Sequence, residues 1–115
     1  MDRLDDVIRE LREFVREREW EQFHDPKNLA MAVAAEAGEL VAELRWVPGP
    51  GADDHCADPA YRERIADEAA DVAITLLMFT DRIGLDLVAE VRRKLEKQRA
   101  KYPADQVRGR WKNDG

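Results

Sequence analysis

The sequence lacks the features of disulfide-bonded, secreted and membrane proteins. Its 115 residues include one cysteine, Cys56, which cannot form a disulfide within the chain. No apolar run approaches the roughly 20 residues that a membrane span needs, so no membrane partner is expected. The acidic, amphipathic start MDRLDDVIRELREF is not expected to be a signal or transit peptide. We therefore expect one cytoplasmic domain.

The sequence also lacks strand-like alternation, repeats and low-complexity tracts. Apolar residues instead recur at helical spacing, which predicts four helices, over residues 4–20, 28–46, 59–83 and 86–101. Pro26 suits a helix start, Asp86 an N-cap, and Gly84 and Pro103 helix ends. We predict an all-α, four-helix bundle-like fold.

Two segments fall outside these helices. Residues 47–59, rich in proline and glycine, are predicted to form a loop. Residues 104–115 are predicted to form a poorly ordered basic tail that follows a domain of residues 1–103. The second and third predicted helices have broad apolar faces for so small a protein, which indicates assembly as a homo-oligomer.

Positive charge gathers near the C-terminus. Residues 92–112 hold nine Lys and Arg and two acidic residues, a net charge of +7, whereas the whole chain carries −6 and the remainder therefore −13. A basic segment can bind nucleic acid or the phosphates of a ligand. Because the rest of the chain is strongly acidic, no nucleic-acid partner is expected.

Acidic residues border the apolar stripe of the predicted helix 28–46. Leu29, Val33 and Leu40 lie within about 60° of Glu36 around the helix axis, and Glu39 lies at the rim of the same stripe. Glu43 continues this face. Its side chain either supports the acid pair from a greater distance or is solvated, and we favour the solvated position. An E-x-x-E pair alone is common on solvated helix faces.

The predicted helix 59–83 repeats the arrangement with Glu68 and Asp71 at the edge of its apolar stripe. If the two helices pack antiparallel, the two acid pairs converge, and their mutual repulsion requires compensation. A divalent cation held by oxygen ligands provides it, with Mg²⁺, Mn²⁺ or Ca²⁺ favoured over zinc. Neither predicted helix contains a histidine, which argues against a di-iron bundle.

The segments WEQFHDPKNLAMAVAAEAGELVAELRW, DEAADVAITLLMF and KLEKQRAKYP resemble the MazG-like nucleotide pyrophosphohydrolases, in particular their small stand-alone dCTP pyrophosphatase-like branch. The resemblance covers about residues 20–103. It implies a MazG-type fold, a homotetramer or homodimer, and Mg²⁺-dependent hydrolysis of a nucleoside triphosphate to the monophosphate and diphosphate, with Mn²⁺ as a substitute. The expected substrate is dCTP or a modified dNTP, in a role of nucleotide-pool sanitation.

The resemblance also assigns roles to residues of this chain. Its E-x-x-E and E-x-x-D motifs correspond to the metal ligands Glu36, Glu39, Glu68 and Asp71, and Glu39 is our first choice of general base. The expected substrate-binding residues are Trp20, His24, Asn28 and Trp46 around the base, and Lys94, Arg99, Lys101 and Tyr102 at the phosphates. The competing interpretation of Trp20 and Trp46 is that they are core tryptophans. That of the basic residues is a solvated basic face of the fourth helix.

Departures from dCTP-type relatives at Leu11, Thr75 and Gln98 leave the base preference open. A related enzyme acting on dUTP or phosphoribosyl-ATP is the nearest alternative. A non-enzymatic helical dimerisation or regulatory module would also explain the apolar helices, but not the matched acid pairs.

Overall fold

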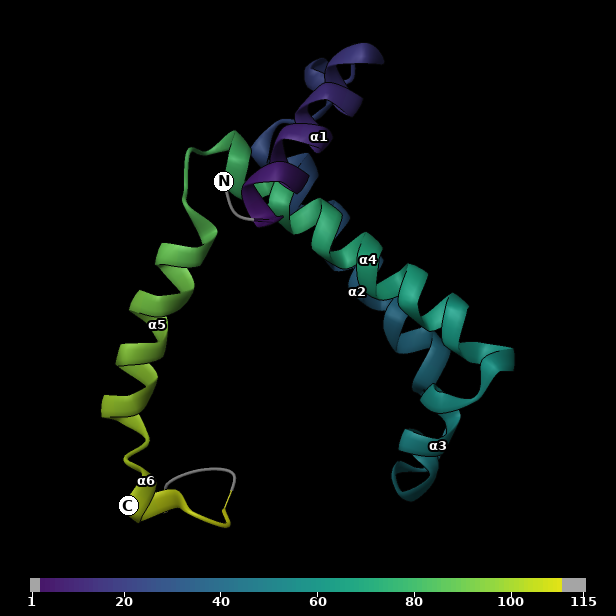
Figure 1. The fold of residues 1–115 in the computed structure, drawn as a ribbon, viewed down its shortest axis with the longest axis vertical. Helices are drawn as coiled ribbons and strands as arrows, with labels where there is room; N and C mark the ends of the chain where they lie inside the picture. Colours follow the sequence, from purple (N-terminus) through teal and green to yellow (C-terminus); the bar gives the residue numbers. More distant parts are fainter. Residues whose placement is uncertain (1–2, 111–115) are drawn as a thin grey trace. The chain divides into compact units, whose positions relative to one another are not determined.

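The computed structural model describes residues 3–110, and its regular structure within this range is all helical (Figure 1). The elements are, in chain order, α1 (Arg3–Glu17), η1 (Glu21–Phe23), α2 (Pro26–Leu44), η2 (Gly49–Gly51), α3 (Ala52–Ala57), α4 (Pro59–Arg82), α5 (Leu87–Lys101) and α6 (Ala104–Val107). The predicted all-α fold and its four long helices are confirmed. None of the helices within residues 3–110 has both the length and the apolar character that a membrane crossing requires. The compartment expected from the sequence stays a prediction.

The chain divides into two compact units, Met1–Gly84 and Leu85–Gly115. The first unit contains α1 to α4, and the second contains α5 and α6. The predicted end of the domain after residue 103 stays a prediction.

Aspartate side chains cap three of the long helices at their N-termini. Asp25 accepts a hydrogen bond from the backbone N–H of Asn28 at 2.8 Å, and Pro26 occupies the first turn of α2. Asp58 caps α4 in the same way, and Asp86 caps α5 by accepting from the N–H of Ala89 at 3.2 Å. These bonds satisfy N–H groups that have no partner inside the helix.

Two segments differ from their predicted form. Residues 47–59, predicted as a loop, contain η2 and α3, because the prolines stand before and after α3 and Asp53 and Asp54 occupy its first turn, where negative charge is favourable. The tail, predicted to be poorly ordered, forms α6 directly after Pro103. The tail's Trp111 lies outside the described residues.

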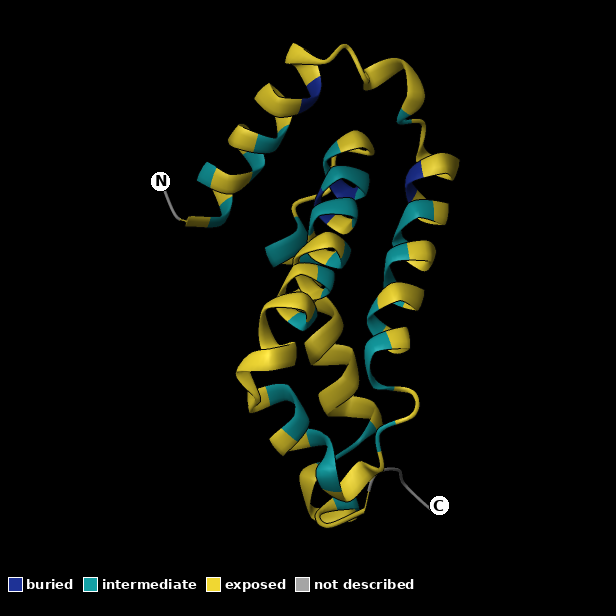
Figure 2. Cartoon of the chain, turned by 90° about the vertical axis from the view of Figure 1, so that its right-hand side faces the viewer, coloured by how far each residue is buried: buried dark blue, intermediate teal, exposed yellow. Residues whose placement is uncertain are grey.

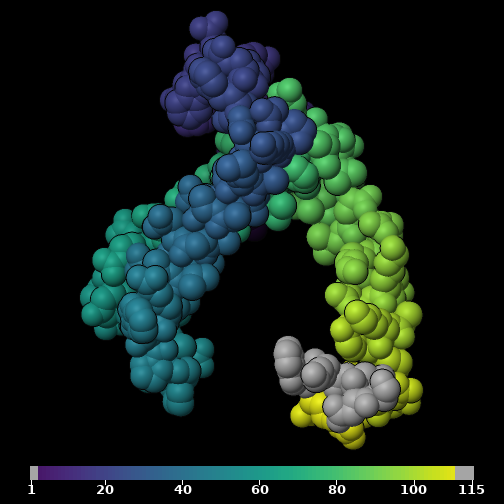
Figure 3. Space-filling view, turned by 180° about the vertical axis from the view of Figure 1, so that it is seen from behind, coloured from purple at the N-terminus to yellow at the C-terminus, as the bar shows by residue number. Residues whose placement is uncertain are grey.

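Helices α2 and α4 form an antiparallel pair that runs along the first unit (Figures 1 and 3). At one end of the pair, Leu29 at the start of α2 and Leu77 near the end of α4 are buried and line the same pocket. At the other end, Arg64 at the start of α4 donates from Nε to Glu43 Oε2 at 2.8 Å. The pairing that the two acid motifs required is therefore present.

The buried part of the core is small and lies where α1, α2 and α4 meet (Figure 2). Val15, Leu29 and Leu77 are each at most 8% exposed, and the buried Thr80 donates its hydroxyl to carbonyls of its own helix. Large apolar side chains of α2 and α4, among them Met31, Val41 and Leu76, are exposed in the single chain. Exposed apolar surface of this kind fits assembly, although the homo-oligomer stays a prediction.

Candidate metal and substrate site

Three of the four predicted metal ligands lie together. Glu36 of α2 and Glu68 and Asp71 of α4 each offer a carboxylate oxygen, and these oxygens all lie within 4.8 Å of one another. Glu68 and Asp71 are one turn apart on α4, whereas Glu36 is brought to them by the antiparallel pairing. Glu36 and Glu68 are half-buried, so their charges are only partly hydrated.

The crowding of negative charge acts most strongly on Glu68. Partial removal from water raises the pKa of this carboxyl above its ordinary value, and neighbouring carboxylates raise it further, in decreasing order Glu39, Asp71, Glu36 and Glu43. Repulsion between like charges at short distance favours the protonated form of one of them. A bound divalent cation would remove this repulsion by neutralising the cluster.

Two further glutamates stand beside the cluster. Glu39, predicted as the fourth ligand and the general base, is exposed and is not one of the three clustered acids, but it is the neighbouring charge that most raises the pKa of Glu68. Glu43, for which we favoured a solvated position, has a side chain only 16% exposed and ion-paired to Arg64. That expectation was wrong, because an arginine 21 residues away on α4 reaches Glu43 across the helix pair.

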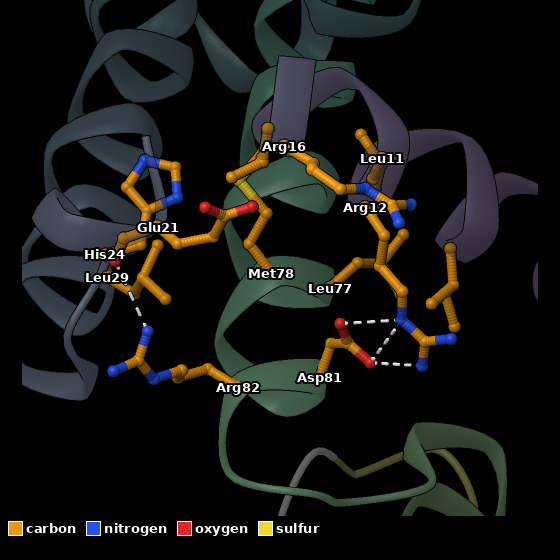
Figure 4. Close-up of a pocket in the computed structure, with 12 residues that line it drawn as sticks. Leu11, Arg12, Arg16, Glu21, His24, Leu29, Leu77, Met78, Asp81 and Arg82 are labelled. Atoms are coloured by element: carbon orange, nitrogen blue, oxygen red, sulfur yellow. Dashed lines mark hydrogen bonds and ion pairs between the residues drawn. The ribbon is translucent and has the colours of Figure 1, made fainter. Parts of the chain in front are cut away.

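A pocket of about 330 Å³ opens between α1, η1 and the α2–α4 pair (Figure 4). Its apolar wall is formed by Ile8, Leu11, Val15, Leu29, Leu77 and Met78, and its polar wall by Arg12, Arg16, Glu21, His24, Asp81 and Arg82. Seven residues separate Leu29 from Glu36 on α2, and seven separate Asp71 from Met78 on α4. The pocket therefore begins about 10 Å along the helix pair from the acid cluster.

The structure places His24, in the segment before α2, in the lining of this pocket, and its predicted role in binding the base stays a prediction. The His24 ring lines the pocket and lies edge-on to the ring of Trp20, with centroids 6.4 Å apart. Trp20 also packs edge-on against Phe14 of α1 at 5.7 Å and is 41% exposed. Asn28 does not line the pocket; its amide donates to the Phe23 carbonyl and holds the turn that carries His24.

Trp46, the second predicted aromatic of the base pocket, is not near Trp20 in the single chain. The two residues flank opposite ends of α2, whose 19 residues span about 28 Å. Trp46 is 83% exposed, and the guanidinium of Arg45 lies 5.3 Å from its ring centroid.

The four predicted phosphate-binding residues belong to the second unit. Lys94 and Arg99 are exposed on α5, and Arg99 forms an ion pair with Glu96 on the same helix. The Lys101 ammonium lies 5.3 Å from the ring centroid of Tyr102, the C-cap residue of α5. The phosphate-binding role of these residues stays a prediction.

Two ion pairs near the site, Glu43–Arg64 and Arg12–Asp81, were not predicted from the sequence. In the second pair, Arg12 of α1 donates from Nε to both carboxylate oxygens of Asp81 on α4, at 3.0 and 2.9 Å. Its partners are 69 residues apart, so no local spacing could have revealed it. The hydrogen bond to Asp81, and then its charge, raise the pKa of Arg12.

Comparison with known proteins agrees with the all-helical fold. The sequence pattern of the MazG-like family matches residues 54–114. The relatives include dCTP pyrophosphatase 1 of Bos taurus, 36% identical over 106 residues, and of Homo sapiens, 38% identical over 109 residues. These alignments cover 92% and 91% of this chain but 63% and 62% of the relatives, so the chain spans just under two thirds of their length.

A solved structure is similar over almost the whole chain. The crystal structure of a pyrophosphatase from Archaeoglobus fulgidus superposes with a TM-score of 0.84 at 31% sequence identity, and the match covers 90% of this chain and 94% of that protein. The chain belongs to the MazG-like family.

Proposed function

We propose that this protein is a nucleoside triphosphate diphosphatase that hydrolyses a (d)NTP to the (d)NMP and diphosphate. The observation that carries the proposal is the convergence of Glu36, Glu68 and Asp71 from two helices. The names of the relatives, dCTP pyrophosphatase and pyrophosphatase, support the reaction class and favour dCTP or a modified dNTP as substrate. Removal of modified nucleotides from the pool is the role that such a substrate implies.

The clustered carboxylates fit Mg²⁺, with Mn²⁺ as a substitute. Hard divalent cations take oxygen ligands, and Glu36, Glu68 and Asp71 present three such oxygens within 4.8 Å of one another. These three residues, with Glu39 as a fourth ligand, would hold the ion. When bound, such an ion neutralises charge on phosphate oxygens and makes water easier to deprotonate.

Other residues would transfer the proton and bind the base. Glu39, exposed beside the cluster, accepts the proton of the water that attacks the α-phosphorus, and diphosphate leaves. Trp20 and His24 receive the base at the pocket, where stacking on an aromatic ring contributes about 1–3 kcal/mol. Asn28 acts on the base indirectly, because it holds the turn that carries His24.

The phosphates of the substrate are bound by Lys94, Arg99, Lys101 and Tyr102, four residues of the second unit. Trp46 contributes to a base pocket only as a residue of a second copy, since α2 separates it from Trp20. A homodimer or homotetramer would supply that copy and would cover the exposed apolar side chains of α2 and α4.

The test is diphosphate release from a panel of nucleotides in the presence of Mg²⁺. The panel holds dCTP, 5-methyl-dCTP, dUTP, dATP, dGTP, dTTP and phosphoribosyl-ATP. We expect release with at least one dNTP, with dCTP or its modified form preferred, and no release without a divalent cation. The Glu36→Gln variant should lose activity at least about 100-fold, whereas Glu63→Gln, on another face of α4, should not. A folded protein that releases no diphosphate from any member of the panel would instead support a non-enzymatic helical module.

A further inference from the structure

The Arg12–Asp81 ion pair is a polar feature of the pocket wall for which the hydrolytic chemistry has no use. Both residues line the pocket, and Figure 4 shows the carboxylate of Asp81 and the guanidinium of Arg12 side by side at one edge of it. Leu77 and Met78, which also line the pocket, are apolar. A charged pair beside apolar surface restricts which polar groups a ligand can bring there.

Asp81 is the less exposed partner. Its side chain is 30% exposed, against 59% for Arg12. An ionised carboxylate only accepts hydrogen bonds and has about four lone-pair positions. Arg12 contributes two donor contacts to Oδ1 and one to Oδ2, so Oδ2 retains capacity for a further donor.

Asp81 lies far enough from the acid cluster to contact the far edge of a base when the α-phosphate of the same nucleotide lies at the cluster. Ten residues of α4 separate it from Asp71, which corresponds to about 15 Å of helix. This length is comparable to an extended nucleotide measured from a cation at its α-phosphate to the far edge of its base. The apolar side chains of Leu29, Leu77 and Met78 lie between the two points and suit the faces of a base ring.

We propose that Asp81, oriented by Arg12, is a specificity-determining residue that favours nucleotides whose base carries an exocyclic amino group. The carboxylate accepts a hydrogen bond from an N–H of cytosine or adenine, whereas the carbonyl oxygen at the same position of uracil or hypoxanthine meets an acceptor and is disfavoured. The proposal rests on the proposed function, since it assumes that the base occupies this pocket.

The test compares kcat/KM for two matched substrate pairs, dCTP with dUTP and dATP with dITP, in which a carbonyl replaces the amino group and the adjacent ring nitrogen gains a proton. The wild-type protein should prefer the amino member of each pair. The Asp81→Asn variant should reduce the preference about tenfold, a difference of 1.4 kcal/mol, because the asparagine amide can donate to a carbonyl oxygen. The control Asp67→Asn, an exposed residue of α4 that does not line the pocket, should retain the preference. If Asp81 serves only to join α1 to α4, the variant will weaken all substrates equally, and that result overturns the proposal.

A second measurement needs neither a variant nor a metal ion. Calorimetric binding of dCMP and dUMP to the wild-type protein should show the same preference for the amino base.

A third measurement uses methylated substrates. N4-methyl-dCTP keeps one N–H and should remain a substrate, whereas N4,N4-dimethyl-dCTP has none and should lose about tenfold or more in kcat/KM. Equal use of dCTP and dUTP would overturn the inference alone, whereas failure to hydrolyse any nucleotide would overturn the proposed function.

Discussion

The carboxylates of Glu36 and Asp71 come from different helices and lie 35 residues apart in the sequence, yet their nearest oxygens, with one of Glu68, lie within 4.8 Å of one another. Antiparallel pairing of α2 and α4 produces this approach. The same pairing joins Glu43 to Arg64 at one end and forms the pocket wall with Leu29 and Leu77 at the other. One helix pair thus provides the acid cluster and much of the adjoining pocket.

The stability of the metal-free protein should depend on the protonation of Glu68. Since the folded state raises the pKa of this carboxyl, the folded protein binds its proton more tightly than the unfolded chain does. The contribution of Glu68 to the free energy of unfolding should therefore be largest below the ordinary glutamate pKa of about 4.3 and should fall as pH rises through the raised value. Melting curves from pH 4 to 8 in a chelator should show Glu68→Gln more stable than the wild type at the upper end, with the difference vanishing at the lower end.

The control for this experiment is Glu63→Gln, an exposed residue on another face of α4. Its melting temperature should run parallel to that of the wild type across the pH range. Added salt should reduce the advantage of Glu68→Gln, because salt screens repulsion between partly exposed charges. Parallel curves for Glu68→Gln and the wild type would show that the carboxylates do not repel one another as the structure indicates.

The Glu43–Arg64 ion pair should contribute modestly to stability. Glu43 is mostly buried, but Arg64 is 60% exposed, so the coupling between them is expected near the upper end of the range for surface pairs, about 0.5–1 kcal/mol. A double-mutant cycle with Glu43→Gln and Arg64→Ala, measured by urea unfolding, gives this coupling. The matched control is a second cycle that combines Glu43→Gln with Arg62→Ala, since Arg62 donates to the Cys56 carbonyl and not to Glu43. A coupling no larger than that of the control would show that the pair does not hold the helices together.

The contact between α2 and α4 should be sensitive to loss of Leu77. This side chain is 8% exposed, and Leu77→Ala should lower the free energy of unfolding by about 2–5 kcal/mol through lost burial and the cavity left behind. Val41→Ala, at a position 58% exposed in the single chain, should change it by less than about 0.5 kcal/mol if the chain is a monomer, and by more in the proposed homo-oligomer, which would cover this face. Urea unfolding of the two variants makes the comparison. A large effect at Val41 would instead reveal that this face is buried in an assembly.

The N-cap of α2 should matter for both stability and the pocket. Asp25→Ala removes the acceptor for the Asn28 N–H and should cost about 1 kcal/mol. Because Asn28 also donates to Asp25 Oδ2 and to the Phe23 carbonyl, the change should loosen the turn that carries His24. The measurement is urea unfolding together with KM for dCTP, which should rise. Asp58→Ala, at the N-cap of α4, is the control and should lower stability without raising KM.

The elements of the fold were largely predictable because their signals are local. Apolar spacing, Asp86, Pro26 and Gly84 marked the long helices close to their observed ends, and Gly84 has the positive φ of 73° that suits a glycine after a helix. The short helix α3 was missed because the prolines and glycines around it dominate the composition of residues 47–59. Six residues are too few for periodicity to show.

The site was predictable only in part. The i, i+3 spacing within each acid motif is local, so the grouping of Glu68 with Asp71 followed from the sequence, and the approach of Glu36 required only that two apolar stripes meet. The surroundings of the acids depend on pairs distant in sequence, as with Arg64 beside Glu43 and Asp81 beside Arg12, and no spacing rule reaches that far. The separation of Trp20 from Trp46 likewise follows from the length of α2.

Binding of Mn²⁺, followed by the loss of its free-ion electron paramagnetic resonance signal, tests most directly whether the converging carboxylates form a cation site. The wild-type protein should bind Mn²⁺, Mg²⁺ should compete for it, and Glu36→Gln and Asp71→Asn should each weaken binding at least about tenfold, because each removes one of three clustered ligands. Glu63→Gln should bind as the wild type does. Equal Mn²⁺ affinity in all four proteins would contradict the account, since the ion would then be held elsewhere.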